Sequence, residues 1–138
     1  MSYALSRLGP SRLANGSYAQ ATFARNPNTT LLLGSDFPVE PPSPLRGIFA
    51  AVTRLDPDTG KSPHGVGGWY PEQKLTFREA LRGFSIDAAR GGFMEEVGGS
   101  IEVGKWADWV LVEEKGEGLE RGQGAVRETW VGGKKVFG

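Results

Sequence analysis

A run of three leucines constrains the fold of this chain more than any other stretch. It is followed by a glycine and by an acidic turn, residues 35–40, which contains Asp36 and Glu40. Leucines 31–33 follow a turn-forming Asn-Pro-Asn segment, and Gly34 ends the apolar run. Such a run predicts a short strand over residues 31–34 that is buried on both faces, as in a parallel sheet. Asp36 then lies just beyond the carboxyl end of that strand, where α/β folds place their chemistry.

Asp36 also has a simpler interpretation from its local sequence. The Phe37-Pro38 pair prevents a helix from starting at once, because the residue before a proline is driven out of the α region. Aspartate is common in such turns and at helix caps, where its carboxylate accepts hydrogen bonds from nearby backbone groups. Asp36 is therefore either a turn residue or a functional carboxylate.

The hydrophobic periodicity predicts three helices. The first covers residues 11–25 and has an irregular apolar stripe. The second covers residues 43–52, where apolar side chains recur at helical spacing. The third covers residues 76–90 and begins with a capping box formed by Thr76 and Glu79. Helix, turn, buried strand and helix in this order are typical of β/α units.

From residue 98 onward the sequence changes from helical to strand patterning. Residues 107–112 and 126–131 are rich in β-branched and aromatic side chains, and Gly132-Gly133 predicts a tight hairpin turn into a third short strand. The sequence therefore predicts an α/β part over residues 1–97 and an antiparallel β part over residues 98–138.

The loop between the second and third helices contains the single histidine, His64, and a glycine-rich run before Trp69. The run is superficially similar to a dinucleotide fingerprint, but no strand precedes it and no helix follows it, so a phosphate cradle is excluded. The loop is either a lid over a site or a plain connection. His64 and Trp69 are candidate substrate-binding residues; the alternatives are an exposed neutral histidine and a packed aromatic ring.

The composition of the 138-residue chain excludes several classes of function. Sixteen basic residues balance sixteen acidic ones, which leaves no electrostatic case for binding nucleic acid or an anionic membrane. The chain has no cysteine, and one histidine cannot supply the two or three imidazole ligands of a typical zinc enzyme. No run is long enough for a signal peptide or a membrane span, so we expect a soluble cytoplasmic protein.

The sequence resembles one family along nearly its whole length. Residues 34–40, Gly-Ser-Asp-Phe-Pro-Val-Glu, resemble the motif that closes the last barrel strand in the amidohydrolase superfamily. They are most similar to the amidohydrolase-3 branch, which includes N-acyl-amino-acid deacylases and enzymes that deformylate N-substituted formamides. Residues 7–12 and Tyr18 resemble the helix before that strand. The further similar segments, in unchanged order, are residues 44–45, 50–54, 67–71, 79–81, 88–89 and 99–108.

This resemblance implies a fold and an activity. The fold would be a (β/α)8 TIM barrel with one or two divalent metals, usually zinc, at its C-terminal mouth. Residues 1–97 would form the C-terminal part of the barrel, and residues 98–138 would form part of a small β-sandwich built from both chain ends. The activity would be hydrolysis of non-peptide carbon–nitrogen bonds in small molecules, such as N-acyl or N-formyl amides. Asp36 occupies the place of the last-strand aspartate, which binds metal and carries a proton from the metal-bound water to the leaving amine.

The sequence departs from the family pattern because it lacks most of the metal ligands. The His-x-His pair of the first strand has no counterpart, and no lysine stands where a carboxylated lysine would be expected. We therefore expect an incomplete or inactive fragment that binds no metal tightly by itself. The alternative is a non-catalytic remnant that acts by protein association, including self-association through exposed strand edges.

Overall fold

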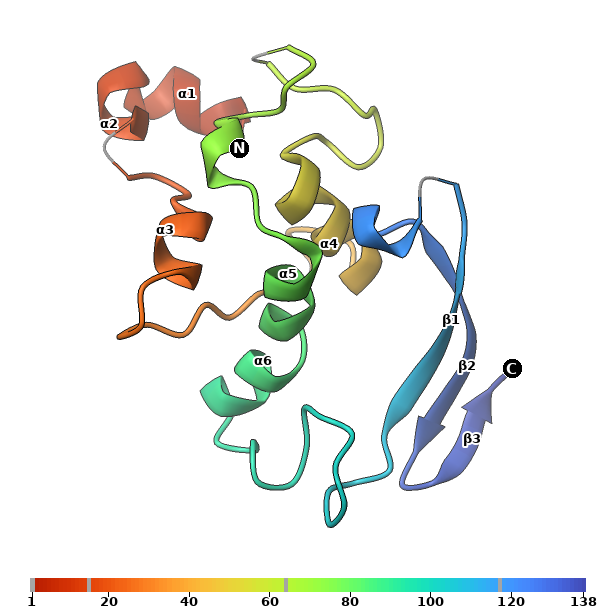
Figure 1. Ribbon diagram of the computed structural model, residues 1–138. Helices are drawn as coiled ribbons and strands as arrows, with labels where there is room; N and C mark the ends of the chain where they lie inside the picture. The colour runs from red at the N-terminus through yellow and green to blue at the C-terminus, as the bar shows by residue number, and fades with distance from the viewer. Residues whose placement is uncertain (1, 15, 64, 117) are drawn as a thin grey trace.

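The computed structural model describes residues 2–14, 16–63, 65–116 and 118–138. Helices gather on one side of the molecule, and three strands run along the other (Figure 1). The α-helices are α1 (Ser2–Leu8), α2 (Pro10–Ala14), α3 (Gln20–Ala24), α4 (Pro44–Thr53), α5 (Phe77–Gly83) and α6 (Ile86–Gly91). The 3-10 helices are η1 (Pro71–Gln73) and η2 (Leu119–Arg121), and the strands are β1 (Trp109–Glu114), β2 (Gly124–Val131) and β3 (Lys134–Phe137).

Two of the predicted helices are each divided into two. The helix predicted over residues 11–25 is wrong as a single element, because α2 and α3 are separated by a segment in which Tyr18 has a φ of 56°. A left-handed residue cannot continue a right-handed helix. The helix predicted over residues 76–90 likewise divides into α5 and α6 at Ser85, whose φ of −127° and ψ of −100° are not helical.

The remaining helix predictions are confirmed. Helix α4 begins with Pro44 in its first turn, where the missing N–H of proline costs no hydrogen bond. The capping box at the start of α5 is complete: the Glu79 backbone N–H donates to the Thr76 hydroxyl at 3.2 Å, and the Thr76 backbone N–H donates to the Glu79 carboxylate at 2.7 Å. Both ends of the box satisfy donors that a helix start leaves unpaired.

The leucine run is extended, but it is not the strand that the sequence predicts. Residues 31–35 form no ladder with a strand of the described chain, and Leu32 is 47% exposed. Leu33 nevertheless anchors the segment, because its backbone N–H donates to the Gly83 carbonyl at 3.0 Å. A doubly buried strand requires paired neighbours on both sides, and the described residues form none here.

The core lies where α3, α4 and α5 meet. Its buried residues are Ala21, Ile48, Ala51, Leu75 and Ala80. Partly buried side chains around them are Ala24, Leu31, Leu33, Val52, Phe77 and Phe84. The leucine run therefore packs on the core with its first and third side chains and positions the acidic turn that follows.

The β part of the chain is confirmed as an antiparallel sheet with the order β1-β2-β3. Trp109 and Trp130 pair across β1 and β2, with stacked rings whose centroids are 5.3 Å apart. Gly132 and Gly133 connect β2 to β3 with φ of 56° and 74°, as a hairpin turn with positive φ at both central residues requires. Several apolar side chains of the sheet remain exposed, among them Val110, Leu111, Val131, Val136 and Phe137.

The sheet contacts the helical part through η2 and α4. Gly122 follows η2 with a φ of 69°, and a Cβ placed on it would collide with the backbone of Leu45 and Phe49 in α4. Only glycine allows this approach. No helix in the described part of the chain is long and apolar enough to cross a membrane. The barrel, the sandwich and the division at residue 97 stay predictions.

Candidate functional site

Asp36 stands on a tight turn directly after the leucine run. Its backbone has a φ of 52°, a left-handed conformation that aspartate tolerates better than most residues. The Val39 N–H donates to the Asp36 carbonyl at 2.9 Å and closes the turn around a cis Phe37-Pro38 bond. The Asp36 side chain is exposed. Its carboxylate is therefore accessible, and the turn is closed by the backbone hydrogen bond.

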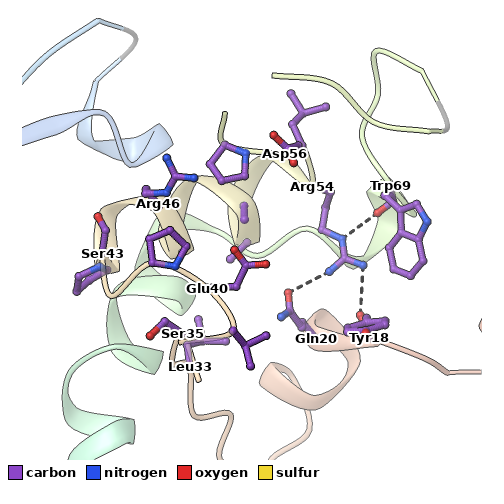
Figure 2. Close-up of a pocket in the computed structure, with 18 of the residues that line it drawn as sticks. Tyr18, Gln20, Leu33, Ser35, Glu40, Ser43, Arg46, Arg54, Asp56 and Trp69 are labelled. Carbon is purple, nitrogen blue, oxygen red and sulfur yellow. Dashed lines mark hydrogen bonds between the residues drawn. The ribbon is translucent and has the colours of Figure 1, made fainter. Parts of the chain in front are cut away.

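A cavity of about 1150 Å³ opens beside this turn. Its neighbours Ser35, Val39 and Glu40 line it, whereas Asp36 itself is not a lining residue. Most of the wall is apolar; examples are Leu33, Pro42, Pro44, Ala50, Leu55 and Phe84. Figure 2 shows Ser35, Glu40 and Ser43 apart from Trp69, on the segment between the leucine run and α4. The cavity thus joins an apolar wall to a carboxylate-bearing turn.

Arg54 holds the far wall of the cavity. It caps the C-terminus of α4 in the left-handed conformation, with a φ of 61°, and its residue is only 1% exposed. Its guanidinium donates to the Trp69 carbonyl at 2.8 Å, to the Gln20 side-chain oxygen at 3.0 Å and to the Tyr18 carbonyl at 3.4 Å (Figure 2). Burial lowers the pKa of Arg54 from its ordinary value. Arg54 therefore ties together three segments that are distant in sequence.

Trp69 completes this arrangement. The Arg54 guanidinium lies 5.1 Å from its ring centroid, within the range of a cation–π interaction. Tyr18 and Tyr70 contact the ring edge-to-face, with centroid separations of 5.5 and 4.6 Å. Trp69 is 1% exposed, so nearly all of its surface already contacts neighbours. It lines the cavity as packed wall, and its predicted role in substrate binding stays a prediction.

The charged groups at the rim of the cavity are mostly paired. Arg46 donates to the Asp58 carboxylate at 2.7 Å, and this hydrogen bond raises the pKa of Arg46 and lowers that of Asp58. Backbone hydrogen bonds from Thr59 lower the pKa of Asp56, whose carboxylate holds its own loop together. These paired groups shape the rim, and Glu40 and Lys61 are the further charged residues of the lining.

The sequence-predicted site residues meet only in part. Trp69 lines the cavity, Asp36 directly follows the lining residue Ser35 without lining it, and His64 lies outside the described residues. Sequence reasoning missed Arg54, although it closes a segment, residues 50–54, that belongs to the resemblance. A single arginine after a helix is most often exposed, so only the contacts reveal its burial.

The residues present do not by themselves fit a metal ion. No group of three or more histidine, cysteine, aspartate or glutamate side chains able to hold a metal occurs in the ranges that the structure describes. Asp36 alone offers one carboxylate, whereas structural and catalytic zinc sites use three or four protein ligands. Any metal at this turn would need donors from outside these residues.

Comparison with known proteins agrees with the resemblance. A model of the Amidohydrolase family matches residues 1–137. Protein LONG AFTER FAR-RED 3 of Arabidopsis thaliana is 35% identical over 133 residues, which cover 95% of this chain and 22% of that protein. The chain thus spans about a fifth of the length of this curated relative. No solved structure matches significantly. Because the family model matches almost every residue, the chain belongs to the amidohydrolase family.

Proposed function

We propose that this chain contributes the last-strand carboxylate of a metal-dependent hydrolase that cleaves non-peptide carbon–nitrogen bonds. Its substrates would be small-molecule amides such as N-acyl or N-formyl amines. The observation that carries the proposal is the placement of Asp36: an exposed carboxylate on a left-handed turn, with Ser35 and Val39 on either side lining a large cavity. Left-handed non-glycine residues cost conformational energy and cluster at functional sites.

Asp36 would act as a proton carrier. A carboxylate at the edge of the cavity can accept a proton from the attacking water and later donate it to the leaving amine. The divalent metal of the family, which we propose to be zinc, would take its other ligands from residues outside this chain. Asp36 would be the one ligand that this chain supplies.

The cavity wall bears on the kind of amide that would fit. Its apolar side chains, such as Leu33, Leu55 and Phe84, favour a substrate with an apolar acyl or amine substituent. We propose Trp69 and His64 as substrate-binding residues, Trp69 through the cavity wall that it forms with Arg54. This role of Trp69 would be indirect, since its ring is buried.

The test is steady-state hydrolysis of N-formyl and N-acyl amines by a longer protein that contains this chain. Asparagine keeps the size and the left-handed tolerance of aspartate but cannot carry the proton, so Asp36→Asn should lower kcat by at least about a hundredfold. Glu96→Gln, which removes an exposed carboxylate that does not line the cavity, is the control and should keep kcat within about threefold.

The proposal fails if Asp36→Asn retains normal turnover with normal metal content. Folding is checked separately by circular dichroism and thermal unfolding. Because Asp36 is exposed, Asp36→Asn should leave the spectrum and the unfolding temperature nearly unchanged.

The second candidate function is association with another protein, without catalysis. The exposed apolar side chains of the sheet favour it, since Leu111, Val136 and Phe137 are each more than half exposed. Strands β1 and β3 are the edges of the sheet in the described chain, and such edges can pair with a further strand. A longer protein that is inactive both with and without Asp36 would favour this candidate.

A further inference from the structure

A second, smaller cavity of about 290 Å³ lies on α5 and α6, apart from the candidate site. The turn after α3, residues 26–31, forms its other side, and Figure 1 shows this turn running from α3 toward α5. Among the residues that the structure describes, none lines both cavities. The polar residues that line the small cavity are Asn26, Thr29, Thr30, Glu79, Arg82, Asp87 and Arg90.

Two arginines in this cavity converge on one oxygen atom. Arg82 donates to Oδ1 of Asp87 at 2.9 Å, and Arg90 donates to the same Oδ1 at 2.8 Å. The Asp87 side chain is 12% exposed, whereas those of Arg82 and Arg90 are 48% and 46% exposed. One carboxylate thus holds two guanidinium groups beside the cavity, and its single negative charge cannot neutralise both.

The other acidic group of the cavity is already engaged. Glu79 accepts from Arg25 at 3.1 Å and from the Thr76 backbone N–H at 2.7 Å. Burial opposes ionisation of Glu79, but these hydrogen bonds outweigh it and hold the pKa of Glu79 below its ordinary value. Because Arg25 balances Glu79, the excess positive charge remains on the pair of arginines. A guanidinium has five N–H donors, so each arginine has donors left after its bond to Asp87.

We propose that this cavity binds a small oxyanion, either a phosphate group or a carboxylate, between Arg82 and Arg90. The oxyanion would accept charge-assisted hydrogen bonds from both guanidinium groups, with Asn26 and Thr30 as further polar groups of the wall. Asp87 holds the two arginines in place and competes with the ligand for their charge. The site goes beyond the proposed hydrolase function and does not depend on it.

The test is a titration of the 15N-labelled 138-residue chain, monitored by NMR, with inorganic phosphate in one arm and acetate in the other. Ionic strength is held near about 0.1 M, where unspecific surface attraction is screened. We expect saturable shifts of the arginine side-chain signals, and the arm with the tighter binding identifies the chemical class of the ligand. Arg82→Gln and Arg90→Gln should each weaken binding about tenfold, as expected for the loss of one partly exposed charge-assisted bond.

Two further variants test whether these residues form a binding site or a purely structural cluster. Arg78 lies in α5, as Arg82 does, but it does not line the cavity. Arg78→Gln should therefore leave the affinity unchanged. Asp87→Asn removes the competing charge and should tighten binding severalfold, even if it lowers stability. Shifts that do not saturate in either arm would overturn the proposal. Equal loss of affinity in Arg78→Gln and Arg90→Gln, or weaker binding in Asp87→Asn, would overturn it as well.

Discussion

At the scale of single residues, left-handed backbone gathers around the candidate site. Of the non-glycine residues with positive φ in the described chain, Tyr18 and Arg54 line the large cavity, Tyr70 contacts Trp69, and Asp36 directly follows the lining residue Ser35; Phe93, after α6, does not line it. Such conformations persist only where the surroundings impose them. At Arg54 the surroundings are visible, since three hydrogen bonds and the Trp69 ring fix its side chain.

Substitutions at Arg54 separate the contribution of its side-chain contacts to stability from the cost of its left-handed backbone. Arg54→Ala should lower the free energy of unfolding by about 3 kcal/mol, because it leaves oxygen acceptors of Trp69, Gln20 and Tyr18 without their donor. Arg54→Gly should be about 1 kcal/mol more stable than Arg54→Ala, because glycine adopts a φ of 61° without strain. Denaturant unfolding measures both.

Arg54→Lys is the control for charge alone, and it should fall between wild type and alanine, since an ammonium cannot reach all three acceptors in the same geometry. An alanine variant as stable as wild type would show that the Arg54 contacts contribute nothing.

At the scale of elements, local sequence signals predicted the starts of helices and the positions of turns better than the lengths of helices. The capping box at Thr76 and the Gly132-Gly133 hairpin are present where expected, because each depends on residues within a few positions of one another. The divisions at Tyr18 and Ser85 could not be read from apolar spacing, since each depends on a non-helical backbone conformation at a single residue. Tyr18 also accepts a hydrogen bond from Arg54, 36 residues away.

The start of α5 should respond to acid. The pKa of Glu79 is lower in the folded chain than its ordinary value of 4.5, so ionised Glu79 stabilises the fold above that pH. This stabilisation should be lost as the pH falls through the folded pKa. In Glu79→Gln the contribution is absent, and the difference in unfolding free energy from wild type, below about 1 kcal/mol for this half-exposed pair, should shrink between about pH 5 and 3.

Glu96→Gln, at an exposed acidic residue after α6, controls for the loss of one carboxylate. A Glu79→Gln difference that stays constant over this pH range would contradict the role given to the Arg25–Glu79 pair.

At the scale of the whole molecule, the order of motifs predicted the family, and the family model confirms that relationship over residues 1–137. The barrel could not be tested in the same way, because the leucine run forms no sheet with the described residues. Of the residues that line the candidate site, the sequence singled out Trp69, and the functional roles of Asp36, His64 and Trp69 stay predictions. Its cavity and the Arg54 contacts were not, because they join segments that are far apart in sequence.

We propose above that Asp36 is the one metal-site carboxylate of this chain and that the other ligands lie outside it. The decisive measurement is the zinc content of the 138-residue chain after equilibrium dialysis, for wild type and for Asp36→Asn. We predict far less than one zinc per chain in both proteins, since a single carboxylate holds zinc weakly. One zinc per wild-type chain, lost in Asp36→Asn, would contradict the proposal by showing that the chain completes a metal site by itself.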